Sequence, residues 1–188
     1  MAQLIYVLCC GGTIEKVYSE QSGAVVNLDS KIDGYLTQLR LPDLTIETVR
    51  LMNKDSLEMT AGDRESILQA ILLRLASKAP VIITHGTDTM VETGLFLQRN
   101  ITGLMVPIIL TGAMSPLGFE RSDGLQNLTE SLLAARILTA GVYVVMHNQV
   151  FPVDKTRKDR ERATFVRTDL NATPDSSSAQ STPPDRPK

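Results

Sequence analysis

Residues 81–94 read VIITHGTDTMVETG and decide the fold. The first three are apolar and β-branched, which is typical of a strand buried on both faces of a parallel sheet. The next six, THGTDT at 84–89, are polar, and Met90 begins a stretch with helical character. The polar cluster therefore lies on a turn from a strand to a helix. In open α/β sheets such turns lie at the carboxyl ends of the strands, where ligands bind.

This polar turn also has a simpler interpretation. Thr87 or Asp88 could merely cap the helix that follows, since both residue types are preferred at helix N-termini. A second strand favours a functional role. Residues 4–8 (LIYVL) form another apolar run, followed by two cysteines, two glycines and Thr13. Paired glycines allow a sharp turn and the close approach of a ligand, so two strands that end in Gly-Thr indicate working threonine hydroxyls.

The rest of the chain alternates apolar strands with amphipathic helices. We expect further strands at 45–51, 106–110 and 142–146, and helices at 30–39, 67–75, from Met90 and at 125–135. Thr60 and Asp63 resemble a capping box before the second helix, and residues 15–26 a loop or short hairpin over the site. This pattern predicts an α/β fold with a doubly wound, mostly parallel sheet and helices on both faces.

The length of 188 residues agrees with a single domain. We place this domain at residues 1–170. Residues 171–188 are rich in Ser and Pro and contain no aromatic residue, so we expect a disordered tail there.

Composition narrows the class of protein. A net charge of −2 and a pI near 5.7 predict no general attraction to nucleic acid or to membranes. Cys9 and Cys10 are adjacent and would point to opposite faces of a strand, which indicates neither metal ligation nor a disulfide. The N-terminus lacks a basic region before its apolar run, and no apolar run approaches the length of a membrane span. We therefore expect a cytoplasmic protein without a signal peptide.

Three motifs together resemble the N-terminal domain of the bacterial-type L-asparaginase family. They are GGTIEKVY at 11–18, THGTDTM at 84–90, and LTGAMSP followed by RSDGLQNL within 110–128. The likeness covers about residues 2–167 in order. The family's usual smaller C-terminal domain has no counterpart, so the chain resembles the short-chain, single-domain asparaginases. The resemblance implies hydrolysis of asparagine to aspartate and ammonia, without a metal or a cofactor.

The resemblance also implies catalytic roles. Thr13 is similar to the primary nucleophile, Tyr18 to its hydrogen-bonded loop partner, and Thr87 to a second catalytic threonine paired with a lysine. A threonine hydroxyl is a poor nucleophile at neutral pH, and a lysine with a lowered pKa can serve as its base. The family spacing identifies that lysine as Lys158, with Lys155 as the alternative. The basic residues around them could instead form a solvated surface.

Three further residues are similar to the family's substrate-binding residues. Asp88 corresponds to the carboxylate that takes the substrate's α-ammonium group, an assignment that charge complementarity also favours. Ser56 corresponds to the serine that receives the α-carboxylate, and Ala113 to the residue whose carbonyl meets the side-chain amide. Structural alternatives are open for two residues, because Tyr18 could be a core-facing aromatic and Ser56 a turn residue. We expect His85 to be structural.

Two rival functions are open. The chain could be a non-catalytic relic that binds asparagine, aspartate or a partner, or it could hydrolyse a larger amide, as tRNA-dependent amidotransferase subunits do. The presence of Thr13, Thr87, Asp88 and Lys158 favours an L-asparaginase. We also expect a homodimer, because the apolar stripes of the helices exceed what one sheet needs.

Overall fold

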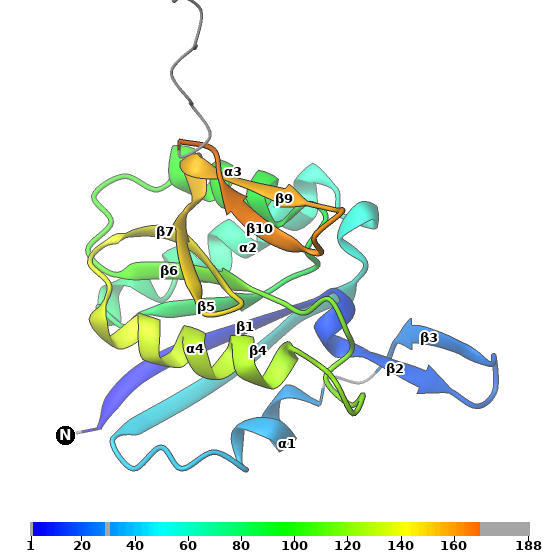
Figure 1. The fold of residues 1–188 in the computed structure, drawn as a ribbon. Helices are drawn as coiled ribbons and strands as arrows, with labels where there is room; N and C mark the ends of the chain where they lie inside the picture. Colours follow the sequence, from blue (N-terminus) through cyan, green and yellow to red (C-terminus); the bar gives the residue numbers. More distant parts are fainter. Residues whose placement is uncertain (1, 29–30, 170–188) are drawn as a thin grey trace, which may run out of the picture.

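The computed structural model describes residues 2–28 and 31–169, which form a sheet between two layers of helices (Figure 1). The six strands of the sheet are β1 (Gln3–Gly11), β4 (Leu44–Lys54), β5 (Val81–Thr84), β6 (Pro107–Thr111), β7 (Gly141–Met146) and β8 (Gln149–Pro152). Their order is β4-β1-β5-β6-β7-β8, and each neighbouring pair is parallel except β7 with β8. The predicted doubly wound, mostly parallel sheet is confirmed.

Two helices cover each face of this sheet. The helices are α1 (Ile32–Leu36), α2 (Ala61–Leu72), α3 (Met90–Asn100) and α4 (Gly124–Ile137). Because successive strand residues point to opposite faces, each strand supplies both layers. Cys10 packs in the core under α2 and α3, whereas Cys9 packs in the core under α1 and α4. Both cysteines are buried, and their places in the two cores confirm that they point to opposite faces of the strand.

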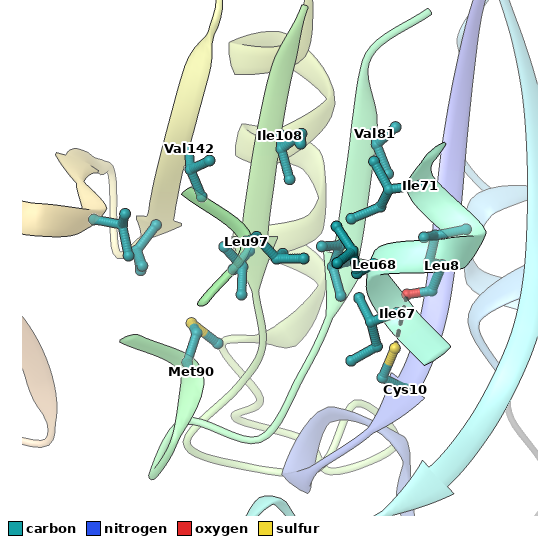
Figure 2. Packing of buried hydrophobic residues seen from close by; sticks show 14 of the residues in the cluster. Leu8, Cys10, Ile67, Leu68, Ile71, Val81, Met90, Leu97, Ile108 and Val142 are labelled. Carbon is teal, nitrogen blue, oxygen red and sulfur yellow. Dashed lines mark hydrogen bonds between the residues drawn. The ribbon is translucent and has the colours of Figure 1, made fainter. Parts of the chain in front are cut away.

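The core under α2 and α3 is drawn in Figure 2. Ile67 and Ile71 of α2 and Met90 and Leu97 of α3 are fully buried in the same cluster as Val81 of the sheet. Burial of each such side chain contributes about 1.5–3 kcal/mol relative to exposure. The central strands are therefore a rigid platform for the loops at their carboxyl ends.

Local sequence signals explain where the helices begin. Thr60 and Asp63 form the predicted capping box, since Asp63 N donates to Thr60 Oγ1 at 3.2 Å and Thr60 N donates to Asp63 Oδ2 at 2.8 Å. The helix expected at 30–39 is shorter, because α1 has five residues and turns follow it. Gly34 lies in its middle and weakens helical propensity, and the N-cap residue Lys31 makes no side-chain cap.

Two antiparallel hairpins lie outside the sheet. The first, β2 (Lys16–Ser19) with β3 (Ala24–Asn27), is the hairpin expected in residues 15–26, and it projects from the body of the molecule (Figure 1). The second, β9 (Thr156–Asp159) with β10 (Thr164–Arg167), lies beside α3. Phe165 of β10 is buried in the core under α2 and α3 and anchors this hairpin.

Some predictions concern the ends of the chain and its relation to membranes. The tail at 171–188 and the domain boundary at residue 170 lie outside the described residues. Within residues 2–28 and 31–169, no helix combines the length and the apolar character needed to cross a membrane.

Candidate active site

The strand order places the two threonine turns at one point of the sheet. From β1 the chain crosses to β4 on one side, whereas from β5 it continues to β6 and β7 on the other side. Ligands of open α/β sheets bind at the carboxyl ends of the strands where the order reverses in this way. Thr13 follows β1 and Thr87 follows β5, so both lie at this switch point.

Glycine contacts hold these turns against each other. A Cβ added to Gly12 would lie 2.2 Å from Gly86 N, and one added to Gly86 would lie 2.5 Å from Ser56 Oγ. Gly12 also has a φ of 80°, which an L side chain rarely adopts. Two glycines therefore allow the loops that carry Thr13, Thr87 and Ser56 to meet. Ser56 is buried rather than an exposed turn residue.

The loop after β6 joins the same edge. A Cβ on Gly112 would lie 2.3 Å from the carbonyl oxygen of His85, so the loop after β6 contacts the turn after β5 directly. Ala113, the next residue in this loop, is fully buried. Asn127 Nδ2 donates to Gly112 O at 2.9 Å. Asp123 accepts two backbone N–H groups just beyond Ala113, each at 3.0 Å. The start of α4 thus fixes the loop that carries Ala113.

Lys158 reaches this edge from β9. Its Nζ donates to Thr87 Oγ1 at 2.6 Å and to Asp88 Oδ1 at 3.1 Å. The alternative, Lys155, pairs instead with Asp169, whose Oδ2 lies 3.6 Å from its Nζ. The structure therefore brings Lys158, and not Lys155, to the threonine.

The helix-capping interpretation of Thr87 and Asp88 does not fit this geometry. The N-cap residue of α3 is Thr89, and it makes no side-chain cap. Its hydroxyl donates instead to the carbonyl oxygen of Ser56 at 2.9 Å, which ties two loops of the site together. Thr87 and Asp88 both contact Lys158, so their side chains serve the site rather than the helix.

His85 is buried beneath the threonine turn with both ring nitrogens hydrogen bonded. Nδ1 must donate, because its partner at 2.8 Å is the carbonyl oxygen of Gly86. Nε2 then accepts from the hydroxyl of Thr93 at 2.9 Å, and Arg64 Nε donates to that hydroxyl at 3.2 Å. Burial and, to a smaller extent, the nearby Arg64 charge lower the pKa of His85 to about 4, against the hydrogen bond to Gly86 O, which raises it. A neutral, fully satisfied imidazole agrees with the expected structural role.

Tyr18 is a predicted site residue that the structure leaves apart from Thr13. It lies on β2 with 60% of its surface exposed, so the core-facing alternative is wrong. Among the described residues no hydrogen bond joins it to Thr13. The base of the hairpin is nevertheless tied to the site, since Asn27 Nδ2 donates to Gly12 O at 3.0 Å. The partnership of Tyr18 with Thr13 stays a prediction.

Two residues at the site were missed by the sequence analysis. Glu15 is 3% exposed, and its Oε1 accepts from Gly11 N at 3.1 Å and from Thr84 Oγ1 at 2.7 Å. The guanidinium of Arg160 lies 2.8 Å from Asp88 Oδ1. Arg160 lies in the turn that follows β9, so no strand period in the sequence places it at the site. In the described ranges, no group of three or more His, Cys, Asp or Glu side chains is arranged to hold a metal.

Several known proteins are similar to this chain in sequence. The family model described as asparaginase, N-terminal, matches residues 4–173. The L-asparaginase of Thermococcus kodakarensis is 32% identical over 148 residues, which are 78% of this chain and 44% of that protein. L-asparaginase 1 of Escherichia coli strain K12 is 33% identical over 162 residues, 82% of this chain and 47% of that protein.

Solved structures share the fold. The thermostable L-asparaginase from Thermococcus kodakarensis matches with a TM-score of 0.79 at 29% identity, over 88% of this chain and 51% of that one. The probable cytoplasmic L-asparaginase of Campylobacter jejuni gives 0.74 at 26% identity, over 87% and 51%. The chain thus spans about half the length of the relatives it matches. Because the family model covers most of the chain and the sequence and fold of relatives agree, this chain belongs to the asparaginase family.

Proposed function

We propose that this chain is an L-asparaginase that hydrolyses asparagine to aspartate and ammonia through a threonine nucleophile. One observation carries the proposal, namely the 2.6 Å contact of Lys158 Nζ with Thr87 Oγ1 at the switch point that Thr13 also borders. A hydroxyl held this close to an amine can exchange a proton with it, which an activated nucleophile requires.

In the proposed reaction, Thr13 Oγ attacks the carbon of the side-chain amide. The carbon–nitrogen bond then breaks, and the nitrogen takes a proton and leaves as ammonia. Water hydrolyses the resulting ester on Thr13, which releases aspartate and restores the hydroxyl. Thr87 and Lys158 relay the protons in both steps. Tyr18 hydrogen bonds to Thr13 when the β2–β3 hairpin covers the site.

The remaining site residues orient the substrate. Asp88 binds the α-ammonium group, Ser56 the α-carboxylate, and the Ala113 carbonyl accepts a hydrogen bond from the amide nitrogen. The buried positions of Ser56 and Ala113 support this assignment, because a fixed group positions a substrate more accurately than an exposed one.

The direct test is ammonia and aspartate release from L-asparagine by the purified chain, with two matched lysine variants. Lys158→Met should reduce kcat at least about 100-fold, the lower range for a general acid–base group. Lys155→Met should stay within about twofold, because surface substitutions have small effects. Equal losses in both variants would contradict the role of Lys158. Calorimetric binding of aspartate without any ammonia release would favour the non-catalytic rival.

We propose in addition that the chain forms a homodimer and acts in the cytoplasm. The exposed apolar side chains Leu133 and Ile137 of α4 support self-association, and the Campylobacter relative described as cytoplasmic supports the location. Light scattering should give twice the mass of one chain, and a concentration-independent monomer would refute the dimer. Fractionation of the source cells should recover the protein with cytoplasmic markers.

A further inference from the structure

The carboxylate proposed to bind the substrate's ammonium group already has cationic neighbours. Asp88 Oδ1 lies 3.1 Å from Lys158 Nζ and 2.8 Å from the guanidinium of Arg160. Its Oδ2 makes no hydrogen bond or ion pair with any residue that the structure describes. A substrate ammonium would be a further cation on this one side chain.

We infer that Arg160 is a specificity-determining residue that competes with the substrate's α-ammonium group for Asp88. The inference rests on the proposed function, in which Asp88 is the ammonium site. Arginine keeps its positive charge at all relevant pH values, so its ion pair with Asp88 does not depend on the protonation of the guanidinium. Substrates and products that carry an ammonium group must displace it, whereas ligands without that group need not.

The exposure of its side chain identifies Arg160 as the cation that moves away from Asp88 when an ammonium group binds. Its side chain is 71% exposed, compared with 17% for Lys158. An exposed ion pair is weak because water solvates both partners, so the guanidinium can rotate into solvent at small cost. Lys158 has a second contact with Thr87, which keeps it in the site.

The backbone that carries Arg160 does not depend on its side chain. The turn between β9 and β10 is closed by Arg162 N, which donates to Asp159 Oδ1 at 3.1 Å, and by Ala163 N, which donates to Arg160 O at 3.4 Å. Neither bond involves the guanidinium. A substitution at Arg160 should therefore change the charge at Asp88 without unfolding the hairpin.

Two dicarboxylate ligands that differ only in the ammonium group test its effect on binding. L-Aspartate, the product of the proposed reaction, carries it, and succinate is the same molecule without it. If Arg160 competes with the ammonium, removal of its charge should tighten aspartate binding and leave succinate binding unchanged or weaker. General opening of the site would instead tighten both ligands.

The experiment compares the full chain with Arg160→Gln and with the control Arg162→Gln. Arg162 lies in the same turn, and its side chain has no hydrogen bond or ion pair with any described residue. Calorimetry should give a dissociation constant for L-aspartate about fivefold lower in Arg160→Gln, the upper range for an exposed ion pair, and an unchanged one in Arg162→Gln. With asparagine, KM should fall by a similar factor while kcat stays within about twofold. Arg160→Lys should lie between the wild type and Arg160→Gln.

Three results would overturn the inference. Weaker aspartate binding in Arg160→Gln would mean that Arg160 supports the ligand, and equal tightening of aspartate and succinate would mean that the ammonium is not involved. Binding of neither ligand to any form would remove Asp88 as an ammonium site. Ammonia release by the wild type is scored separately. Selective tightening of aspartate without any release would support the competition and refute the hydrolysis.

Discussion

The β5–α3 turn and the β2–β3 hairpin border the same edge of the sheet, yet they are held in different ways. In the turn, Thr84 and His85 are fully buried and hydrogen bonded, and Thr87 is 5% exposed. In the hairpin, Tyr18 is 60% exposed, and the contacts with the body are at its base. The proposed site therefore combines a part fixed by the core with a part that folding of the sheet does not fix. Substitutions in the turn should change stability or catalysis strongly, whereas those in the hairpin should change stability less.

The largest effect on catalysis is expected when the hydroxyl of Thr87 is removed. Thr87→Val keeps the side-chain volume but removes the group that contacts Lys158, so kcat for asparagine should fall at least about 100-fold. Thr87→Ser should recover part of this loss because it restores a hydroxyl. Steady-state ammonia release measures both variants. A Thr87→Val enzyme that keeps more than a tenth of wild-type kcat would contradict the proposed proton relay.

At this edge of the sheet, the largest loss in the free energy of unfolding is expected where a substitution disturbs the close contact of Gly12 with Gly86. Gly12→Ala places a Cβ 2.2 Å from Gly86 N at a φ of 80°, so overpacking and backbone strain should together cost more than about 3 kcal/mol. Gly23→Ala, in the hairpin, is the matched control. It has a φ of 64° with nothing within 4 Å, and should cost about 1–2 kcal/mol. Urea unfolding compares the two, and similar losses would mean that the glycine contact is not tight.

A pH effect should arise from His85 beneath the turn. Burial lowers its pKa from the ordinary 6.5 to about 4, so the unfolded chain takes up a proton in this range that the folded chain does not. Stability is therefore fully present above pH 6.5 and is lost as the pH falls to 4, by about 3 kcal/mol. Denaturant unfolding at pH 7, 5.5 and 4.5 measures this slope. His85→Asn should flatten it, and an unchanged slope in that variant would assign the effect elsewhere.

The smallest effect on the fold is expected in the hairpin. Tyr18→Phe removes a hydroxyl from an exposed side chain, so the free energy of unfolding should stay within about 0.5 kcal/mol of wild type. If Tyr18 reaches Thr13 over bound substrate, kcat/KM should nevertheless fall about tenfold, which corresponds to one lost hydrogen bond of about 1.4 kcal/mol. Unchanged kcat/KM would show that the hairpin plays no part in catalysis.

The central strands could be predicted from the sequence because β5 and β6 are buried on both faces and β1 and β7 are mostly buried. Their short apolar runs, such as 81–83, leave few alternatives, and the glycines that follow mark the turns. The β9–β10 hairpin was not predicted. Its strands read TRKD and TFVR, which show no apolar alternation, and Phe165 alone anchors them in the core. A strand held by one side chain and by cross-strand hydrogen bonds has no periodic signal of its own.

The residues of the candidate site also fall into those that the sequence predicts and those that it does not. Thr13 and Thr87 lie in motifs, and the resemblance to the family led to Ser56 and Lys158. Glu15 and Arg160 were missed because their importance depends on contacts between segments distant in sequence. Glu15 bonds to Thr84, which is 69 residues away, and Arg160 lies 72 positions after Asp88, so both pairs meet only in the fold. The sequence around Arg160 is rich in basic residues, and composition alone cannot identify which of these side chains reaches the site.

The proposed hydrolysis depends most on Thr13, and one measurement tests the role of this residue directly. Ammonia release from L-asparagine by Thr13→Ala should be compared with that of the wild type, together with the melting temperature of both. We predict that Thr13→Ala loses nearly all activity while its melting temperature stays close to that of the wild type, because the deleted group lies at a turn outside the core. Thr13→Ala with more than a tenth of wild-type kcat would contradict a threonine nucleophile at this position.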